Sequence, residues 1–100
     1  MAIVEVSITP LGTATSSVSA YVAGCVKIAR ESGLKCQLTA MGTIFEGDLD
    51  QIMSCIRRMQ ESVFAAGADR VTSAIKIDDR RDKPGQGMES KVAAVESKLC

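Results

Sequence analysis

Apolar and polar side chains alternate along residues 2–9, which read AIVEVSIT. Val4, Val6 and Ile8 fall on one side of this stretch, and the polar residues between them fall on the other. A period of two predicts a half-buried β-strand. Pro10 and Gly12 come directly afterwards and predict its end.

The pattern changes to a helical period between residues 13 and 33. Thr15 or Ser16 is suited to cap the N-terminus of the predicted helix, and Gly33 is suited to end it. The apolar positions with helical spacing are Val18, Tyr21, Val22, Cys25, Val26 and Ala29.

A second helix is predicted between Gly47 and Gly67. Asp48 is its expected N-cap, with Gln51 three residues later in a capping-box-like arrangement, and Gly67 ends it. Its predicted buried stripe consists of Leu49, Ile52, Met53, Ile56 and Val63.

Two short strand-like segments lie between these helices. Residues 34–40, LKCQLTA, alternate again, and residues 43–46, TIFE, continue after a Met41-Gly42 step. The close spacing predicts an antiparallel hairpin. The period is ambiguous at the second strand because Ile44 and Phe45 are both apolar, so the face that carries Glu46 is left open.

Residues 70–78 return to a period of two, and residues 79–87 form a charged loop that contains proline and glycine. A final short helix is expected over residues 88–99, with an apolar stripe of Met88, Val92, Val95 and Leu99. The order is therefore β-α-β-β-α-β plus one helix. This order predicts an α+β, ferredoxin-like sandwich with an additional C-terminal helix, as a single domain over residues 1–100.

One face of such a sheet is left without helices. If the apolar sets face the helices, the free face is polar but rich in short neutral side chains, which suits packing against a second copy. We therefore expect a homo-oligomer. The residues expected on this face are Glu5, Ser7, Thr9, Gln37, Thr39, Thr72, Ala74 and Lys76.

Composition narrows the range of partners. The 12 basic and 12 acidic residues balance, and only 3% of residues are aromatic, so neither a basic patch nor a stacking platform for nucleic acid is expected. No apolar stretch approaches the length of a membrane span, and no signal peptide is recognisable. We expect a cytoplasmic protein with no membrane partner.

Composition also limits the reactions that the chain could catalyse and the metals that it could bind. The chain has no histidine, tryptophan or asparagine, which excludes Ser-His-Asp and Cys-His catalysis. The four cysteines, which include Cys100 at the end, show no metal-ligand spacing and are expected to be free thiols. We therefore predict no catalytic residues, no metal and no cofactor.

Three clusters remain as candidates for binding. Thr43 and Glu46 are polar residues in a hairpin, although Glu46 could equally be a solvated strand end before a turn glycine. Ser16 and Ser17 belong to a hydroxyl-rich segment before a helix, where an oxygen-rich group could bind or a polar loop could simply be exposed. Arg80 and Arg81 could bind phosphate, but a network with the neighbouring aspartates is favoured.

Several motifs together resemble a known family. The segments VSITPLGTATSSVSAYVA, LTAMGTIFEGDLD, GADRV, IKIDDRRD and KVAAV occur in that order. This set closely resembles the thiamine-binding protein family, small ferredoxin-like proteins of the YkoF-like superfamily that were long catalogued as an uncharacterised conserved family. The resemblance covers nearly the whole chain.

The resemblance implies a cytosolic, non-catalytic protein that binds thiamine or its hydroxymethylpyrimidine moiety as a homodimer or homotetramer. In this interpretation Glu46 bonds the aminopyrimidine or offsets the thiazolium charge. Thr43, Ser16 and Ser17 orient the ligand, and Met41 covers its ring. Two alternatives are an oligomeric interaction or regulatory module without a ligand and an acylphosphatase-like hydrolase. The second is disfavoured because the chain lacks asparagine.

Overall fold

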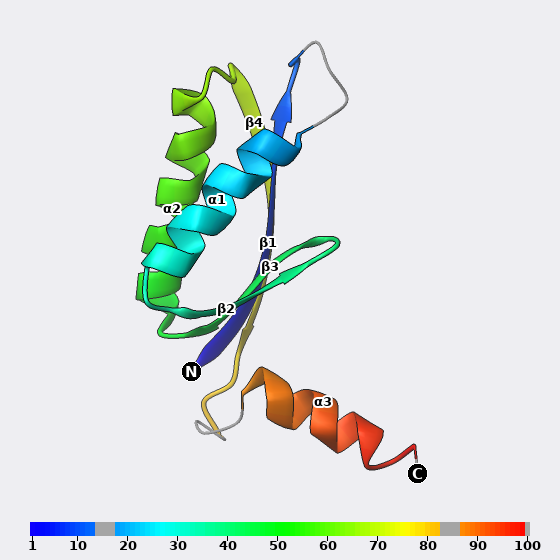
Figure 1. Cartoon of the computed structure of the whole chain (residues 1–100). Coiled ribbons are helices and arrows are strands. Elements are labelled where there is room, and N and C mark those ends of the chain that lie inside the picture. The colour runs from blue at the N-terminus through cyan, green and yellow to red at the C-terminus, as the bar shows by residue number, and fades with distance from the viewer. Residues whose placement is uncertain (14–17, 83–86, 100) are drawn as a thin grey trace.

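The computed structural model describes residues 1–13, 18–82 and 87–99. Four strands form one antiparallel sheet in the order β2-β3-β1-β4, and α1 and α2 lie on one face of it (Figure 1). This arrangement confirms the predicted ferredoxin-like α+β fold. The elements are β1 (Ala2–Leu11), α1 (Ser19–Glu31), β2 (Lys35–Thr39), β3 (Gly42–Gly47), α2 (Leu49–Ala65), β4 (Arg70–Asp79) and α3 (Met88–Glu96).

An aliphatic core fills the space between the sheet and the two helices. Val4, Val6 and Ile8 contribute from β1, as the alternation predicted. The buried side of α2 also contains Cys55 and Met59, which the predicted stripe omitted. Phe45 is fully buried and lies opposite Val4 in the sheet. Burial of this apolar surface is the main force that holds the layers together.

Most helix ends follow the predicted capping chemistry. The backbone N–H of Gln51 donates to Asp48 Oδ2 at 3.0 Å, as expected of an N-cap. Gly33 has φ +80° and lies just beyond the end of α1, where a left-handed residue is favoured. The predicted start of α1 is wrong, because Val18 occupies the N-cap position and has no side-chain cap. Packing of the apolar face of α1, which begins at Val18, outweighs cap preference here.

The first strand is longer than predicted. β1 continues through Pro10 to Leu11, and Pro10 lies opposite Val71 of β4. Pairing of β1 with β3 ends earlier, at Val6 opposite Thr43. Proline is tolerated in a strand where one side has no ladder partner, because the missing N–H then leaves no hydrogen bond unmade.

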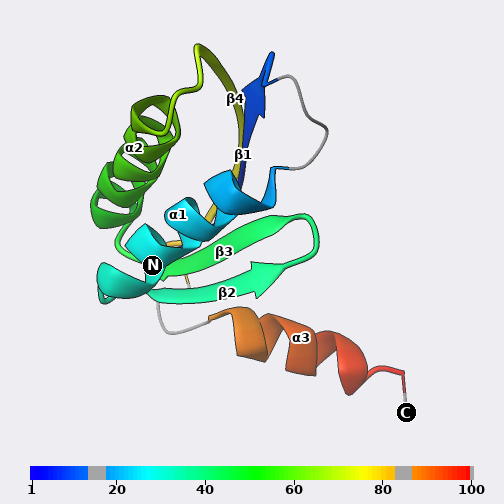
Figure 2. The ribbon, with the colours of Figure 1, turned by 45° about the horizontal axis from the view of Figure 1, so that its top comes forward.

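The sheet register settles which residues face away from α1 and α2. Glu5 lies opposite Lys76 on this face, as expected from the sequence, but Ile3 and Ile44 add apolar side chains to it. Glu46 lies opposite Ile3 and therefore belongs to the same free face. Figure 2 shows α1 on one side of the β2–β3 hairpin and α3 on the other.

Helix α3 buries the least of its surface against the rest of the fold. None of its residues is buried, and Val92 and Val95 remain largely exposed. No described helix is long and apolar enough to span a membrane.

Candidate functional site

A cavity opens where the β2–β3 hairpin separates from β1. The ladder between β1 and β3 stops at Val6 and Thr43, whereas β1 continues alongside β4 as far as Leu11. The cavity has a volume of about 200 Å³ and is lined by β1, α1, the hairpin and one residue of α2. Since β3 does not pair with Ser7, Ile8 and Thr9, the backbone N–H and C=O groups on this side of β1 make no ladder hydrogen bonds to β3.

Thr43 is placed inside this cavity by its position in the ladder. Its partner across the sheet is the core residue Val6, so its side chain points toward the helices rather than to the free face. The residue is only 5% exposed, and its hydroxyl makes no hydrogen bond to a described residue, although the oxygen itself is not fully buried. The hydroxyl can therefore form a hydrogen bond with a polar group that enters the cavity.

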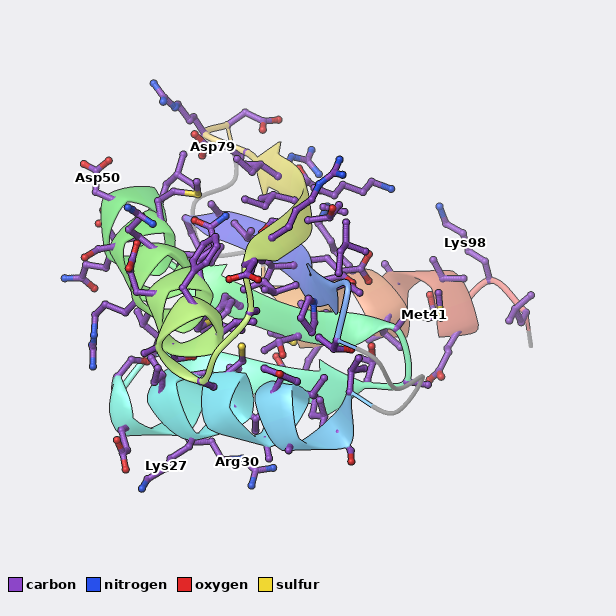
Figure 3. The ribbon with its side chains drawn as sticks, turned by 90° about the horizontal axis from the view of Figure 1, so that it is seen from above. Lys27, Arg30, Met41, Asp50, Asp79 and Lys98 are labelled. Carbon is purple, nitrogen blue, oxygen red and sulfur yellow. The ribbon has the colours of Figure 1, made fainter. Side chains whose placement is uncertain are left out.

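The hairpin turn is held by Thr39. Its hydroxyl donates to the Gly42 carbonyl at 3.0 Å and accepts from the backbone N–H groups of Met41 and Gly42, each at 3.2 Å. These bonds fix the turn that carries Met41, whose side chain is 80% exposed at the hairpin tip (Figure 3). Met41 lines the cavity together with Thr43.

Gly42 lets the hairpin approach β1 closely. A Cβ atom at this position would lie 2.4 Å from the carbonyl oxygen of Val6, which is a backbone atom and cannot easily move. Glycine is therefore required at the point where the hairpin begins to diverge from β1. The Met-Gly-Thr step in the sequence thus has a structural reason.

The cavity wall is neutral. The described lining residues include no carboxylate, ammonium or guanidinium group. Cys25 lies in the wall, where burial raises the pKa of its thiol, and its Sγ–H contacts the Met59 carbonyl oxygen at 3.6 Å. The site therefore offers hydroxyls, backbone groups and apolar surface. It suits an uncharged polar ring better than an ion, because burial of an unpaired charge is costly.

Glu46 does not belong to this cavity. It lies on the free face, is 7% exposed, and is covered by the backbone of Gly87 at the start of α3. Lys35 Nζ lies 3.0 Å from Glu46 Oε2 as an ion pair, but this oxygen has no hydrogen bond of suitable geometry among the described residues. The structure thus separates Glu46 from Thr43 and Met41 by the thickness of the sheet.

Helix α3 is held to the sheet mainly by ion pairs. Lys35 donates to Glu89 at 2.6 Å, and Lys91 pairs with Asp78. The bond with Glu89, supported by Glu46, raises the pKa of Lys35, and it lowers that of Glu89. The bond with Lys91 likewise lowers the pKa of Asp78.

The remaining candidate residues lie outside the cavity lining that the structure describes. Ser16 and Ser17 lie outside the described residues, so their predicted role is not tested. Arg80 pairs with Asp82 at 2.8 Å, and Arg81 pairs with Asp79 at 3.2 Å. The expectation of a self-neutralising network is confirmed. No group of three or more metal-ligating side chains occurs in the part of the chain that the structure describes.

Sequence reasoning missed several residues that line the cavity. The backbone of residues 7–9 and the side chains of Val18, Val22 and Cys25 contribute to it. Val18 and Val22 appeared in the sequence only as part of an apolar helix face. The early end of the β1–β3 ladder has no local sequence signal except Pro10, which marks a position where a strand partner is dispensable.

The fold and the cavity define a ferredoxin-like α+β protein with a small neutral cavity between β1, α1 and the β2–β3 hairpin. Residues 4–96 match the model of the family described as thiamine-binding protein. The chain belongs to this family.

Relatives share almost its whole length. It is 46% identical to the UPF0045 protein YqgV of Bacillus subtilis, with 99% of this chain and 98% of that protein covered. It is 40% identical to a UPF0045 protein of Methanothermobacter thermautotrophicus, with 95% and 96% covered.

Solved structures agree with this fold. The hypothetical protein MJ1052 of Methanocaldococcus jannaschii superposes with a TM-score of 0.87 at 40% identity, and 95% of each chain is covered. A Thermotoga maritima protein whose proposed role is in thiamine biosynthesis or salvage has a TM-score of 0.79, with 94% of this chain and 97% of that chain covered. At 18% identity, the second comparison supports the fold alone.

Proposed function

We propose that this protein binds thiamine without catalysis, as a homo-oligomer, and that the cavity beside Thr43 holds the aminopyrimidine ring. The observation that carries the proposal is the position of Thr43, whose hydroxyl makes no hydrogen bond to a described residue and lines a neutral cavity. Membership of the thiamine-binding protein family supports the choice of ligand.

The size and charge of the cavity favour one ring of thiamine over the other. Pockets for drug-sized ligands usually measure about 300–1,000 Å³. A cavity of about 200 Å³ suits a single six-membered ring. The aminopyrimidine is neutral and carries hydrogen-bond donors and acceptors, which the Thr43 hydroxyl and the unpaired side of β1 can match. The thiazolium is cationic and would remain in the open part of the site.

Glu46 has a different role in this proposal from the one implied by the resemblance. Because it lies on the opposite face of the sheet, it does not contact a ring bound beside Thr43 in the same subunit. Its carboxylate supports Lys35 and the start of α3 instead. Cytoplasmic location and the absence of a required cofactor stay predictions.

Isothermal titration calorimetry tests the proposal. Thiamine and free hydroxymethylpyrimidine should both bind, whereas the isolated thiazole alcohol should not. Thr43→Val keeps the side-chain shape but removes one neutral hydrogen bond, so both affinities should fall about 2- to 12-fold. The matched control is Glu46→Gln, which should leave both affinities unchanged.

Two outcomes would refute the proposal. One is the absence of heat with both thiamine and the pyrimidine. The other is a Thr43→Val variant that binds as tightly as the natural protein, because the ring would then lie elsewhere.

An interaction module without a small ligand is the second candidate. It is favoured by the exposed apolar side chains of α3, which no described residue of the chain buries. Acylphosphatase-like hydrolysis receives no such support, because Arg80 and Arg81 are each paired with an aspartate.

A further inference from the structure

We infer that the site binds a phosphate ester of thiamine in preference to thiamine itself, and that Lys27 and Arg30 of α1 hold the phosphate. The inference rests on the proposed function, because it starts from an aminopyrimidine ring bound beside Thr43. It adds a second subsite and the class of the ligand, and this second subsite can be wrong while the first is right.

A groove on α1 lies directly beside the Thr43 cavity. It measures about 820 Å³ and is bordered by α1 and by Leu38 of β2; we call it the α1 groove. Val18, Val22 and Leu38 line both the cavity and the groove. Val22 is 37% exposed and Leu38 is 50% exposed, so the boundary between the two lies at the surface and is not sealed by core packing. A ligand whose ring occupies the cavity can therefore extend along α1.

The helical repeat arranges this groove from apolar to basic. Val18, Val22 and Val26 are spaced by four residues, so they form one row along the helix. Arg30 continues the row four residues after Val26, and Lys27 lies in the row beside it. The groove is therefore apolar next to the cavity and basic farther along. The helix rises about 8–12 Å from Val22 to the two basic residues, which leaves room for a thiazolium ring and its esterified side arm.

The two basic side chains are available to bind an anion. Lys27 and Arg30 are both exposed, and neither pairs with a carboxylate among residues 1–13, 18–82 and 87–99. Figure 3 shows both of them on the outer side of α1. An ammonium and a guanidinium group can each donate charge-assisted hydrogen bonds to phosphate oxygens.

Charge separates the ester from the free form of the ligand. The cavity wall is neutral, so the aminopyrimidine gains nothing there from a phosphate elsewhere in the molecule. Thiamine carries a positive thiazolium, which Lys27 and Arg30 repel. An ester adds a negative group beside the same two residues and is attracted by them. The preference for the ester should therefore arise wholly in the α1 groove.

Glu31 limits how far the phosphate can extend. It lines the groove and is the last residue of α1. Its carboxylate repels an anion, and so does the negative end of the helix dipole. The phosphate should therefore lie beside Lys27 and Arg30 and not beyond them.

Isothermal titration calorimetry with thiamine and with thiamine diphosphate tests the inference. An exposed ion pair changes an affinity by about 2- to 5-fold, so two pairs should make the diphosphate bind about 4- to 25-fold more tightly than thiamine. Lys27→Gln and Arg30→Gln should each remove about a 2- to 5-fold share of this preference. The double variant should abolish the preference, and its affinity for thiamine should not fall. Glu31→Gln should raise the affinity for the diphosphate.

Two controls separate the phosphate contacts from other effects. Lys98→Gln removes the same charge as Lys27→Gln, but Figure 3 shows Lys98 on a different side of the molecule from α1, so neither affinity should change. Raising the ionic strength from about 0.1 M to about 1 M shortens the Debye length from about 10 Å to about 3 Å. It should reduce the preference for the diphosphate without weakening the binding of thiamine.

The outcomes distinguish this inference from the proposed function. Equal affinities for thiamine and its diphosphate would overturn the inference and leave the proposed function standing. A preference that persists in the double variant would also overturn it, because the phosphate would then be bound elsewhere. Thr43→Val should weaken both ligands by the same factor, and a loss confined to thiamine would overturn the shared position of the ring. Absence of heat with both ligands and with the free pyrimidine would refute the proposed function and the inference together.

Discussion

Replacement of Gly87 by alanine should release α3 from the sheet. The added Cβ would lie 1.6 Å from Glu46 Oε1 and 2.7 Å from its Cδ. The backbone at Gly87 has φ −102° and ψ −171°, which alanine can adopt, so the whole conflict arises from the Glu46 carboxylate. Glu46 is buried and paired with Lys35, whereas α3 buries no side chain. We therefore expect α3 to move in preference to Glu46.

The magnitude follows from two opposing effects. Overpacking of a buried site costs about 1–3 kcal/mol. Alanine also lowers the conformational entropy of the unfolded chain relative to glycine, and this stabilises the folded protein by about 0.4–1 kcal/mol and offsets part of the overpacking cost. The net loss of unfolding free energy should be about 1–2 kcal/mol if α3 remains docked. The loss is smaller if α3 detaches, because it cannot exceed the free energy that docks the helix.

Two measurements separate these cases. Urea unfolding gives the global free energy, and hydrogen exchange of residues 88–96 reports the docking of α3. Gly87→Ala should increase exchange in that segment more than it lowers the urea midpoint. Repeating the substitution in a Glu46→Ala background removes both clashing atoms, so Gly87→Ala should then have little effect. Two results would refute the reasoning. One is unchanged hydrogen exchange of residues 88–96 when Gly87→Ala is made in the natural protein. The other is an equal loss of unfolding free energy from Gly87→Ala in the natural protein and in the Glu46→Ala background.

Phe45→Ala should lower the free energy of unfolding by about 3–5 kcal/mol in urea titrations, because Phe45 is 0% exposed at the centre of the core. Asp78 and Glu89 have pKa values below those of free side chains, so their stabilisation is present above their ordinary pKa values. It is lost as the pH falls through the lower folded values, and amide chemical shifts of α3 should change in acid before those of the core. Burial raises the pKa of the Cys25 and Cys55 thiols, so both should react slowly with a thiol-specific disulfide reagent until urea unfolds the protein. Rapid reaction of either thiol in the native state would contradict the conclusion that both thiols are buried and have raised pKa values.

Local patterns in the sequence were sufficient to predict much of the fold. Alternation in residues 2–9 and 70–78 identified two strands and the side of each that is directed toward the helices, because side chains of a strand point to opposite sides in turn. Asp48 and Gly33 marked helix ends because cap and left-handed positions favour particular residue types. The order of these elements then led to the ferredoxin-like topology.

Tertiary structure decided the arrangement of the candidate site. The sequence could not assign a face to Glu46, since Ile44 and Phe45 are both apolar, and only its position opposite Ile3 resolved this. The cavity beside Thr43 exists because the β1–β3 ladder ends early, and that depends on how distant segments meet. Gly87 is required because α3, far along the chain, approaches the hairpin carboxylate. Side-chain periodicity is a local property, whereas strand register and the closing of one element over another are set by contacts between residues remote in sequence.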